Sequence, residues 1–209
     1  SVPVLGIGSN AAFGTGLITL AGTRQVNFGA VNGDHSVSNN IAFDGAATLG
    51  WLAGADNTND SILANTNQGT LTYLGEVNLG GANRTITGRP RGTLFLGDIT
   101  GSSAGVNYTQ TVGGYFSFLT TSANGGTPKT YSGTTSLGDN AVLVIDSESS
   151  LGTGGNYNPN SSVLQLQPGT TAITLPTTRV VTVNAADNAM FNTPSGSTLT
   201  VQGEIIGAT

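Results

Sequence analysis

The chain has 209 residues, of which only 8% are charged, and its formal net charge is −5 at pH 7. This negative balance argues against a nucleic-acid partner, because phosphate binding requires clustered Lys and Arg. Cysteine is absent, which excludes disulfides and thiolate metal sites, and the length is sufficient to bury a core without them. No apolar run approaches the ~20 residues that a membrane-spanning helix needs, so we expect no membrane insertion of this segment.

Short alternations of apolar and polar residues recur along the whole chain, whereas no helical periodicity is sustained. Each apolar pair brackets one residue, which is the period-two pattern of a strand with one buried face. In chain order the pairs are Ile18/Leu20, Val26/Phe28, Ile41/Phe43, Leu71/Tyr73, Leu94/Leu96, Leu164/Leu166, Ile173/Leu175, Val181/Val183 and Leu199/Val201. The sequence therefore predicts an all-β protein.

The spacing of these strands leaves two architectures open. From Leu164 the leading residues follow at Ile173, Val181, Met190 and Leu199, in steps of nine, eight, nine and nine. An antiparallel sandwich or barrel produces such a rhythm, because its strands recur every ~8–12 residues. So does a solenoid in which two or three short strands make one coil.

Two repeated lines favour the solenoid. "VLGIGSNAAFGTG" (4–16) returns as "VLVIDSESSLGTG" (142–154), and "TLTYLGEV" (70–77) returns as "TLTVQGEI" (198–205). Stacked coils explain such echoes, because corresponding strands occupy equivalent environments. We therefore predict a parallel β-helix that forms one domain over residues 1–209.

The two echoes have different offsets, which predicts coils that carry loop insertions of variable length. The insertions are expected at Gly54–Gly69 and Thr121–Thr135. Tight corners between strands favour Gly and Asn, because these residues accept positive φ. "SVSNNIAF" (36–43) places an Asn pair at such a corner, where Asn side chains of successive coils are expected to bond to one another.

The C-terminal part of the chain resembles a known family. "KTYSGTTSLGDNAVLVIDSESSLGTG" (129–154) resembles the passenger-associated repeat of bacterial autotransporters, in its order of aromatic residue, Gly-Thr-Thr, turn, Leu-Val strand and Leu-Gly turn. Residues 163–207 are similar to the stretch that follows this repeat. The resemblance implies a right-handed parallel β-helix displayed outside the bacterial outer membrane.

Many β-helices cleave polysaccharides, and such enzymes need clustered carboxylates. The eleven carboxylates of this chain are dispersed, with no Asp-Asp or Asp-x-Asp pair. Asp98 and Glu204 follow related strands, so stacking of the coils could bring these two carboxylates together as a catalytic pair. The alternative is that both are solvated turn residues. His35, the single histidine, lies between Asp34 and Ser36. Neighbours in sequence do not make a catalytic triad, so we expect a surface turn.

Candidate ligand-binding residues are few. "ADNTNDS" (55–61) offers oxygen ligands but has Ser61 where a calcium loop requires Gly, so an exposed loop is expected. Arg84, Arg89 and Arg91 are expected to form a solvated loop, and a phosphate or sulfate site is the alternative. We therefore predict no catalytic, metal or cofactor residues.

Aromatic residues gather at "GGYFSFLTT" (113–121), where Tyr115 and Phe118 are expected to pack inside or at the end of the coil. The alternative is an exposed platform for a sugar ring.

These patterns predict a non-catalytic structural or adhesive β-solenoid, and the resemblance to the autotransporter repeat implies that it lies at the bacterial cell surface. A carbohydrate-active β-helix enzyme (lyase or glycoside hydrolase) and a glycan-binding fibre domain are the alternatives. "SVPVLGIG" (1–8) and "GEIIGAT" (203–209) read as strands with unpaired edges. We expect them to pair with further coils, either of the same polypeptide or of identical subunits stacked end to end. Surface glycans are a further expected partner.

Overall fold

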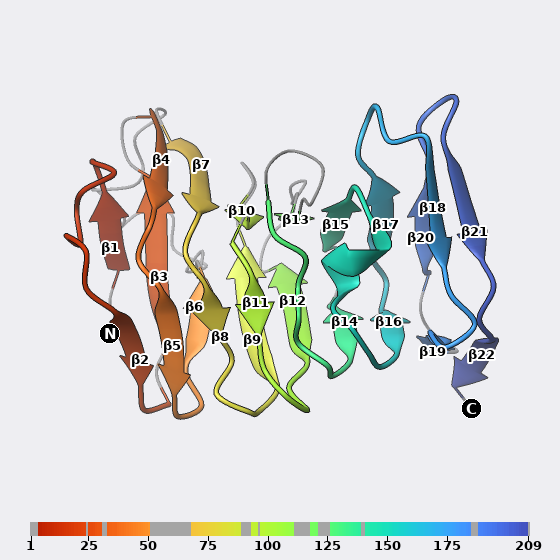
Figure 1. The fold of residues 1–209 in the computed structure, drawn as a ribbon, viewed down its shortest axis with the longest axis horizontal. Coiled ribbons are helices and arrows are strands. Elements are labelled where there is room, and N and C mark those ends of the chain that lie inside the picture. Colours follow the sequence, from red (N-terminus) through yellow and green to blue (C-terminus); the bar gives the residue numbers. More distant parts are fainter. Residues whose placement is uncertain are drawn as a thin grey trace.

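The computed structural model describes residues 4–23, 25–30, 33–50, 68–88, 93–95, 97–110, 118–120, 126–138, 141–184 and 188–208. This part of the chain forms twenty-two short strands and one four-residue 3-10 helix. Every strand pairing is parallel, and strands that pair are separated by others in the sequence. The protein is therefore a parallel β-solenoid, as predicted, and the antiparallel sandwich is excluded (Figure 1).

One sheet runs the whole length of the stack and contributes a strand to every coil. Its nine strands are β1 (Val4–Ile7), β3 (Gln25–Ala30), β6 (Thr48–Gly50), β9 (Arg84–Gly88), β12 (Val106–Gln110), β14 (Thr135–Leu137), β16 (Tyr157–Pro159), β19 (Val181–Asn184) and β22 (Ile205–Ala208).

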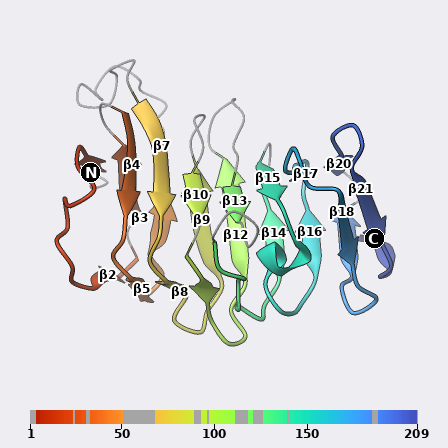
Figure 2. The same ribbon diagram turned by 45° about the horizontal axis from the view of Figure 1, so that its top comes forward.

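A second sheet of seven strands forms the next face of the coils after the N-terminal one, and Figure 2 shows these strands side by side along the molecule. In order along the stack they are β4 (Gly33–Val37), β7 (Gln68–Tyr73), β10 (Thr93–Phe95), β13 (Phe118–Thr120), β15 (Val142–Ile145), β17 (Val163–Leu166) and β20 (Met190–Asn192).

The third face is divided into two sheets. The first contains β2 (Ile18–Ala21), β5 (Ile41–Asp44), β8 (Val77–Asn78) and β11 (Ile99–Thr100), and the second contains β18 (Ala172–Leu175) and β21 (Thr198–Val201). Between them, residues 129–133 and the 3-10 helix η1 (Glu148–Leu151) take the place of strands in two successive coils.

The strand spacing read from the sequence is correct. Leu164, Ile173 and Val181 lie in β17, β18 and β19, which are the three faces of one coil. Met190 and Leu199 then begin the same cycle in the next coil, in β20 and β21. Three strands of about four residues, separated by corners of similar length, therefore make one coil.

The core consists of one inward-facing row per strand, stacked from coil to coil. On the third face Ile41 pairs with Val77, and Val77 pairs with Ile99; all three are buried. On the seven-stranded sheet the rings of Tyr73 and Phe95 stack with centroids 4.8 Å apart. Because each strand buries alternate side chains, each coil covers the apolar rows of its neighbours.

The repeated lines do not stack on one another, which corrects the reasoning that led to the solenoid. Residues 4–7 form β1 of the nine-stranded sheet, whereas their echo at 142–145 forms β15 of the seven-stranded sheet. Likewise, β7 and β21 belong to different faces. What the echoes share is local: a short strand followed by a tight turn.

The predicted insertion at Thr121–Thr135 is also part of the coil for much of its length. Residues 121–125 lie outside the described part of the chain, but Lys129 and Tyr131 are buried, and Thr135 begins β14. The other predicted insertion lies mostly outside the described residues, which resume at Gln68.

The N-terminal coil carries a cap that the sequence did not predict. Residues 9–16 form a turn where later coils have a strand of the seven-stranded sheet. The Phe13 ring packs edge-on against Phe28, with centroids 5.4 Å apart. The buried Asn39, from the predicted Asn corner, donates to the carbonyl of Gly16 at 2.6 Å. It thus bonds to backbone, and not to another Asn.

Truncating the cap in a Phe13→Ala variant should lower the free energy of unfolding by about 1–2 kcal/mol, because Phe13 is only partly buried but contributes the aromatic contact with Phe28. Chemical denaturation followed by circular dichroism measures this. Leu17→Ala is the control, since Leu17 is 64% exposed. Equal losses in both variants would contradict a capping role.

Candidate functional site

Polar side chains gather where the third face has no strand. The backbone amides of Thr130 and Tyr131 both donate to the carbonyl of Ile99 at 3.0 Å, so this segment stays attached to β11 without sheet pairing. On its other side, the amide of Thr153 donates to the carbonyl of Tyr131 at 2.9 Å. The irregular backbone leaves several buried carbonyl groups that need donors.

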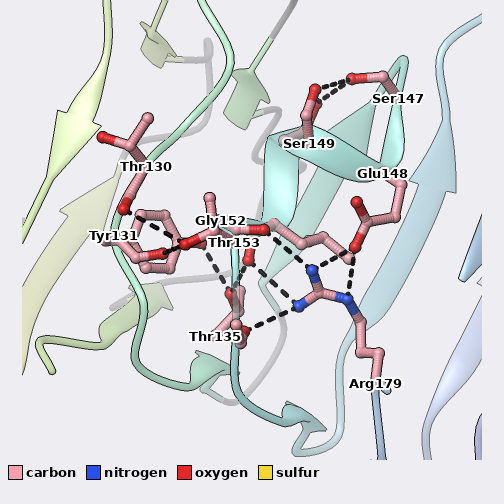
Figure 3. A network of polar contacts seen from close by, with 12 residues as sticks. Thr130, Tyr131, Thr135, Ser147, Glu148, Ser149, Gly152, Thr153 and Arg179 are labelled. Atoms are coloured by element: carbon pink, nitrogen blue, oxygen red, sulfur yellow. Dashed lines mark hydrogen bonds and ion pairs between the residues drawn. The ribbon is translucent and has the colours of Figure 1, made fainter. Parts of the chain in front are cut away.

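Arg179 supplies most of these donors (Figure 3). Its guanidinium donates to the carbonyls of Leu151 and Gly154 at 3.3 Å and of Gly152 at 2.9 Å. Nε donates to a carboxylate oxygen of Glu148 at 2.9 Å, and Nη2 bonds the same oxygen in an ion pair. Arg179 is only 2% exposed, so a buried cation compensates for the missing strand.

A buried tyrosine continues this network (Figure 3). The hydroxyl of Tyr131 lies 2.7 Å from Oγ1 of Thr135, which donates in turn to the carbonyl of Leu151 at 3.0 Å. Burial raises the pKa of Tyr131 to about 12, so the phenol stays protonated at neutral pH. The network is therefore suited to holding the backbone and not to proton transfer at neutral pH.

Lys129, the single lysine of the chain, is buried at the preceding corner. Its ammonium donates to the carbonyls of Phe95 at 3.2 Å, Gly97 at 2.5 Å and Thr127 at 2.9 Å. Burial lowers the pKa of Lys129 to about 8, while the charges of Asp98 and Asp146 act in the opposite direction. Since all three donors are used by backbone carbonyls, the ammonium has a structural role.

The lowered pKa of Lys129 predicts a dependence of stability on pH. Between pH 8 and pH 10.5 the unfolded chain binds a proton at Lys129 that the folded chain has released, so the free energy of unfolding should rise with pH. Above about pH 10 the tyrosines of the unfolded chain ionise, while burial raises the pKa of Tyr73, Tyr108 and Tyr157 in the folded chain, so stability should fall again.

Urea unfolding of wild type and Lys129→Met at pH values of ~7.5, 8.5 and 9.5, on both sides of the lowered pKa of Lys129, would test this. The variant should be less stable overall, because three carbonyls lose their donor, and the rise with pH should disappear. An equal rise in both proteins would assign it to another group.

Next to η1, Asp146 lines a hollow of about 390 Å³. Asp146 directly follows β15 and is 7% exposed, and Oγ of Ser150 donates to its Oδ1 at 3.2 Å. The rest of the lining is the loop of residues 167–171, which joins β17 to β18, and Ala172, the first residue of β18. Asp146 stands where the first repeated line has Gly8, so this carboxylate is particular to the second line.

The carboxylate pair considered from the sequence is not brought together. Asp98 precedes β11 on the third face, whereas Glu204 precedes β22 of the nine-stranded sheet at the far end of the stack. Both carboxylate oxygens of Asp98 bond to Thr130, Oδ1 to the amide at 2.9 Å and Oδ2 to the hydroxyl at 2.8 Å. Asp98 therefore links two coils.

His35 and Arg84 differ from their predicted surface-loop settings. His35 lies in strand β4, half-buried, with Nδ1 3.3 Å from Oδ1 of Asn10. Arg84 begins β9 and is buried: Nε donates to the carbonyl of Leu79 at 2.8 Å, and the guanidinium lies over the Phe43 ring. Arg84 thus belongs to the coil corner and not to a solvated arginine loop.

Several sequence candidates cannot be placed. The possible calcium loop (55–61), Arg89, Arg91 and Tyr115 lie outside the described residues, and Phe118 lies in β13 without a described side chain. Among the residues that are described, no group of three or more His, Cys, Asp or Glu side chains is placed to hold a metal. The same part of the chain contains no helix long and apolar enough to cross a membrane.

The fold and these contacts define a class of protein: a parallel β-solenoid whose buried charges hold its backbone. Comparison with protein families, with curated proteins and with solved structures finds no match to the chain.

Sequence reasoning missed Lys129, Arg179 and Asp146. Their signal is rarity, because an isolated charge beside an apolar strand stands out in a chain with 8% charged residues. Such a residue is retained inside a fold only when it is paired.

Proposed function

We propose that this chain is a non-catalytic structural or adhesive β-solenoid of a bacterial cell-surface protein, in which a stiff rod is the working part. The observation that carries the proposal is the use of polar side chains to bond successive coils. The bacterial and extracellular setting follows from the resemblance of residues 129–154 to the autotransporter repeat.

Coil-to-coil bonds occur on all three faces of the stack. Oδ1 of Asp34 accepts the amide of Thr70 at 2.7 Å, from one strand of the seven-stranded sheet to the next. On the nine-stranded sheet, Oγ1 of Thr87 and Thr109 lie 3.0 Å apart. Further examples are Glu76–Thr100, Asn40–Glu76, Asn83–Gly105, Gln165–Asn192 and the Asn160–Asn184 pair. Side chains used in this way stiffen the rod, because bending it breaks bonds between coils.

Antibody labelling of intact cells of the source bacterium tests the location. We expect labelling before lysis and its loss after brief treatment of the cells with an external protease. Labelling only after lysis would refute the surface assignment.

The C-terminal end of the described chain supports pairing with a further coil. Met190 is 57% and Ile205 58% exposed, and β20, β21 and β22 each form the edge of their sheet. An apolar end with three free strand edges is suited to accept parallel strands of another β-coil. The opposite end differs, because the turn of residues 9–16 covers part of it.

Light scattering of the isolated chain at increasing concentration tests this pairing. In this experiment the partner of each chain is a second copy of the same chain. Wild type should associate, and Ile205→Lys should weaken association by placing a charge in the apolar end. Leu74→Lys is the matched control, since Leu74 is 45% exposed and lies between β7 and β8, away from both ends of the stack. A monomeric wild type at all concentrations would count against self-pairing.

A further inference from the structure

The hollow beside η1 arises from the corner between the seven-stranded sheet and the third face. Ile145 pairs with Leu166, so Asp146 and Gln167 occupy the same corner in successive coils. The amide of Gln167 donates to the carbonyl of Ile145 at 2.7 Å, and the loop then turns outward, with the amide of Thr170 bonded to Gln167. The volume of the hollow, about 390 Å³, falls within the range of small-molecule sites.

Both walls of the hollow are held in place. The carboxylate of Asp146 is tied to η1 through Ser150. The loop is tied to the last coil, because Oγ of Ser197 donates to the carbonyl of Thr170 at 2.6 Å. A site that is already ordered loses little conformational entropy when it binds.

The lining combines hydrogen-bonding groups of both kinds with an apolar ring. Among the lining residues, Asp146 carries a carboxylate, Gln167 an amide, Thr170 and Thr171 hydroxyls, and Pro168 a pyrrolidine ring. A carboxylate accepts strong, charge-assisted hydrogen bonds from hydroxyl groups and repels anions. The hollow is too large for a bare cation held by one carboxylate, and calcium needs six to eight oxygen ligands.

We propose that this hollow binds a neutral saccharide ring, whose hydroxyls bond to Asp146 and to the threonines while its C–H face lies on Pro168. The proposal deepens the proposed function by giving the rod a glycan ligand. Sugar binding is measured on the purified chain, whereas the surface location is tested on intact cells. A failure of the sugar proposal is therefore distinguishable from a failure of the surface assignment.

Saturation-transfer NMR of the full chain with glucose, galactose, mannose and N-acetylglucosamine tests the site. At least one of these sugars should bind. Asp146→Asn should weaken that binding by about tenfold or more, because a hydrogen bond to a charged group is lost. Asp44→Asn, at the exposed end of β5, is the matched control and should bind as wild type does.

Thr171→Val provides a second variant that leaves the buried carboxylate untouched, since Thr171 is exposed. It should also weaken binding while unfolding at the wild-type denaturant concentration. The proposal is overturned if no neutral sugar binds wild type, if Asp146→Asn binds as well as wild type, or if glucuronate binds as well as glucose. Binding of calcium alone, without any sugar, would also overturn it.

Discussion

Replacing Arg179 with Met should lower the free energy of unfolding by about 3–5 kcal/mol, the largest loss we expect from a single side chain. The apolar side chain fills similar space but removes the donor to the carbonyls of Gly152 and Gly154, and one of the two donors to the carbonyl of Leu151. It also leaves Glu148 without its ion pair. Denaturant unfolding measured by circular dichroism gives the loss directly.

Two further variants separate the charge from the hydrogen bonds. Arg179→Lys should recover only part of the stability, because an ammonium cannot reproduce the planar fork of donors. Glu148→Gln should cost less than Arg179→Met, about 1–2 kcal/mol, since its amide oxygen still accepts a bond and the carbonyls keep their donors. A stability of Arg179→Met equal to that of wild type would show that the network does not support the fold.

Gly97→Ala should destabilise the protein by about 3 kcal/mol or more, through overpacking between coils. A Cβ atom at Gly97 would lie 2.1 Å from the carbonyl oxygen of Gly75 and 2.7 Å from that of Leu74. Both neighbours are backbone of the preceding coil, so neither moves without separating the coils. The carbonyl of Gly97 also accepts a hydrogen bond from the Lys129 ammonium, and separating the coils would strain this bond.

Gly8→Ala is the control, because a Cβ at Gly8 meets no atom within 4 Å. Its free energy of unfolding should change by less than about 1 kcal/mol. Thermal and urea unfolding of both variants measure the difference. Similar stabilities of Gly97→Ala and Gly8→Ala would mean that the coils are not in close contact at this corner.

The strands were predictable because their signal is local. Within β17 the buried Leu164 and Leu166 alternate with Val163 and Gln165, and the next strands follow after corners of nearly constant length. The Asn pair before β5 marked a corner correctly, but the partner of the buried Asn39, the carbonyl of Gly16, which lies 23 residues earlier in the chain, is a tertiary contact that no local pattern indicates.

The repeated lines were a poor guide to which strands are neighbours. β1 and β15 share a local sequence but lie in different sheets, with β1 at the first edge of its sheet and β15 inside the other. Similar sequence specifies a similar strand and turn, but the face that it occupies depends on how many strands precede it. The number of preceding strands depends in turn on which coils lack a strand on the third face.

The sequence by itself determined the kind of structure: short strands in a low-charge chain, two or three to a coil, with apolar residues turned inward. Period-two alternation and corner spacing are properties of a few consecutive residues, so they can be read directly. Only the tertiary structure decided that Arg179 meets Glu148, 31 residues away, and that Lys129 and Asp146 are buried. Those contacts join different coils, and the lengths of every intervening corner set which residues meet.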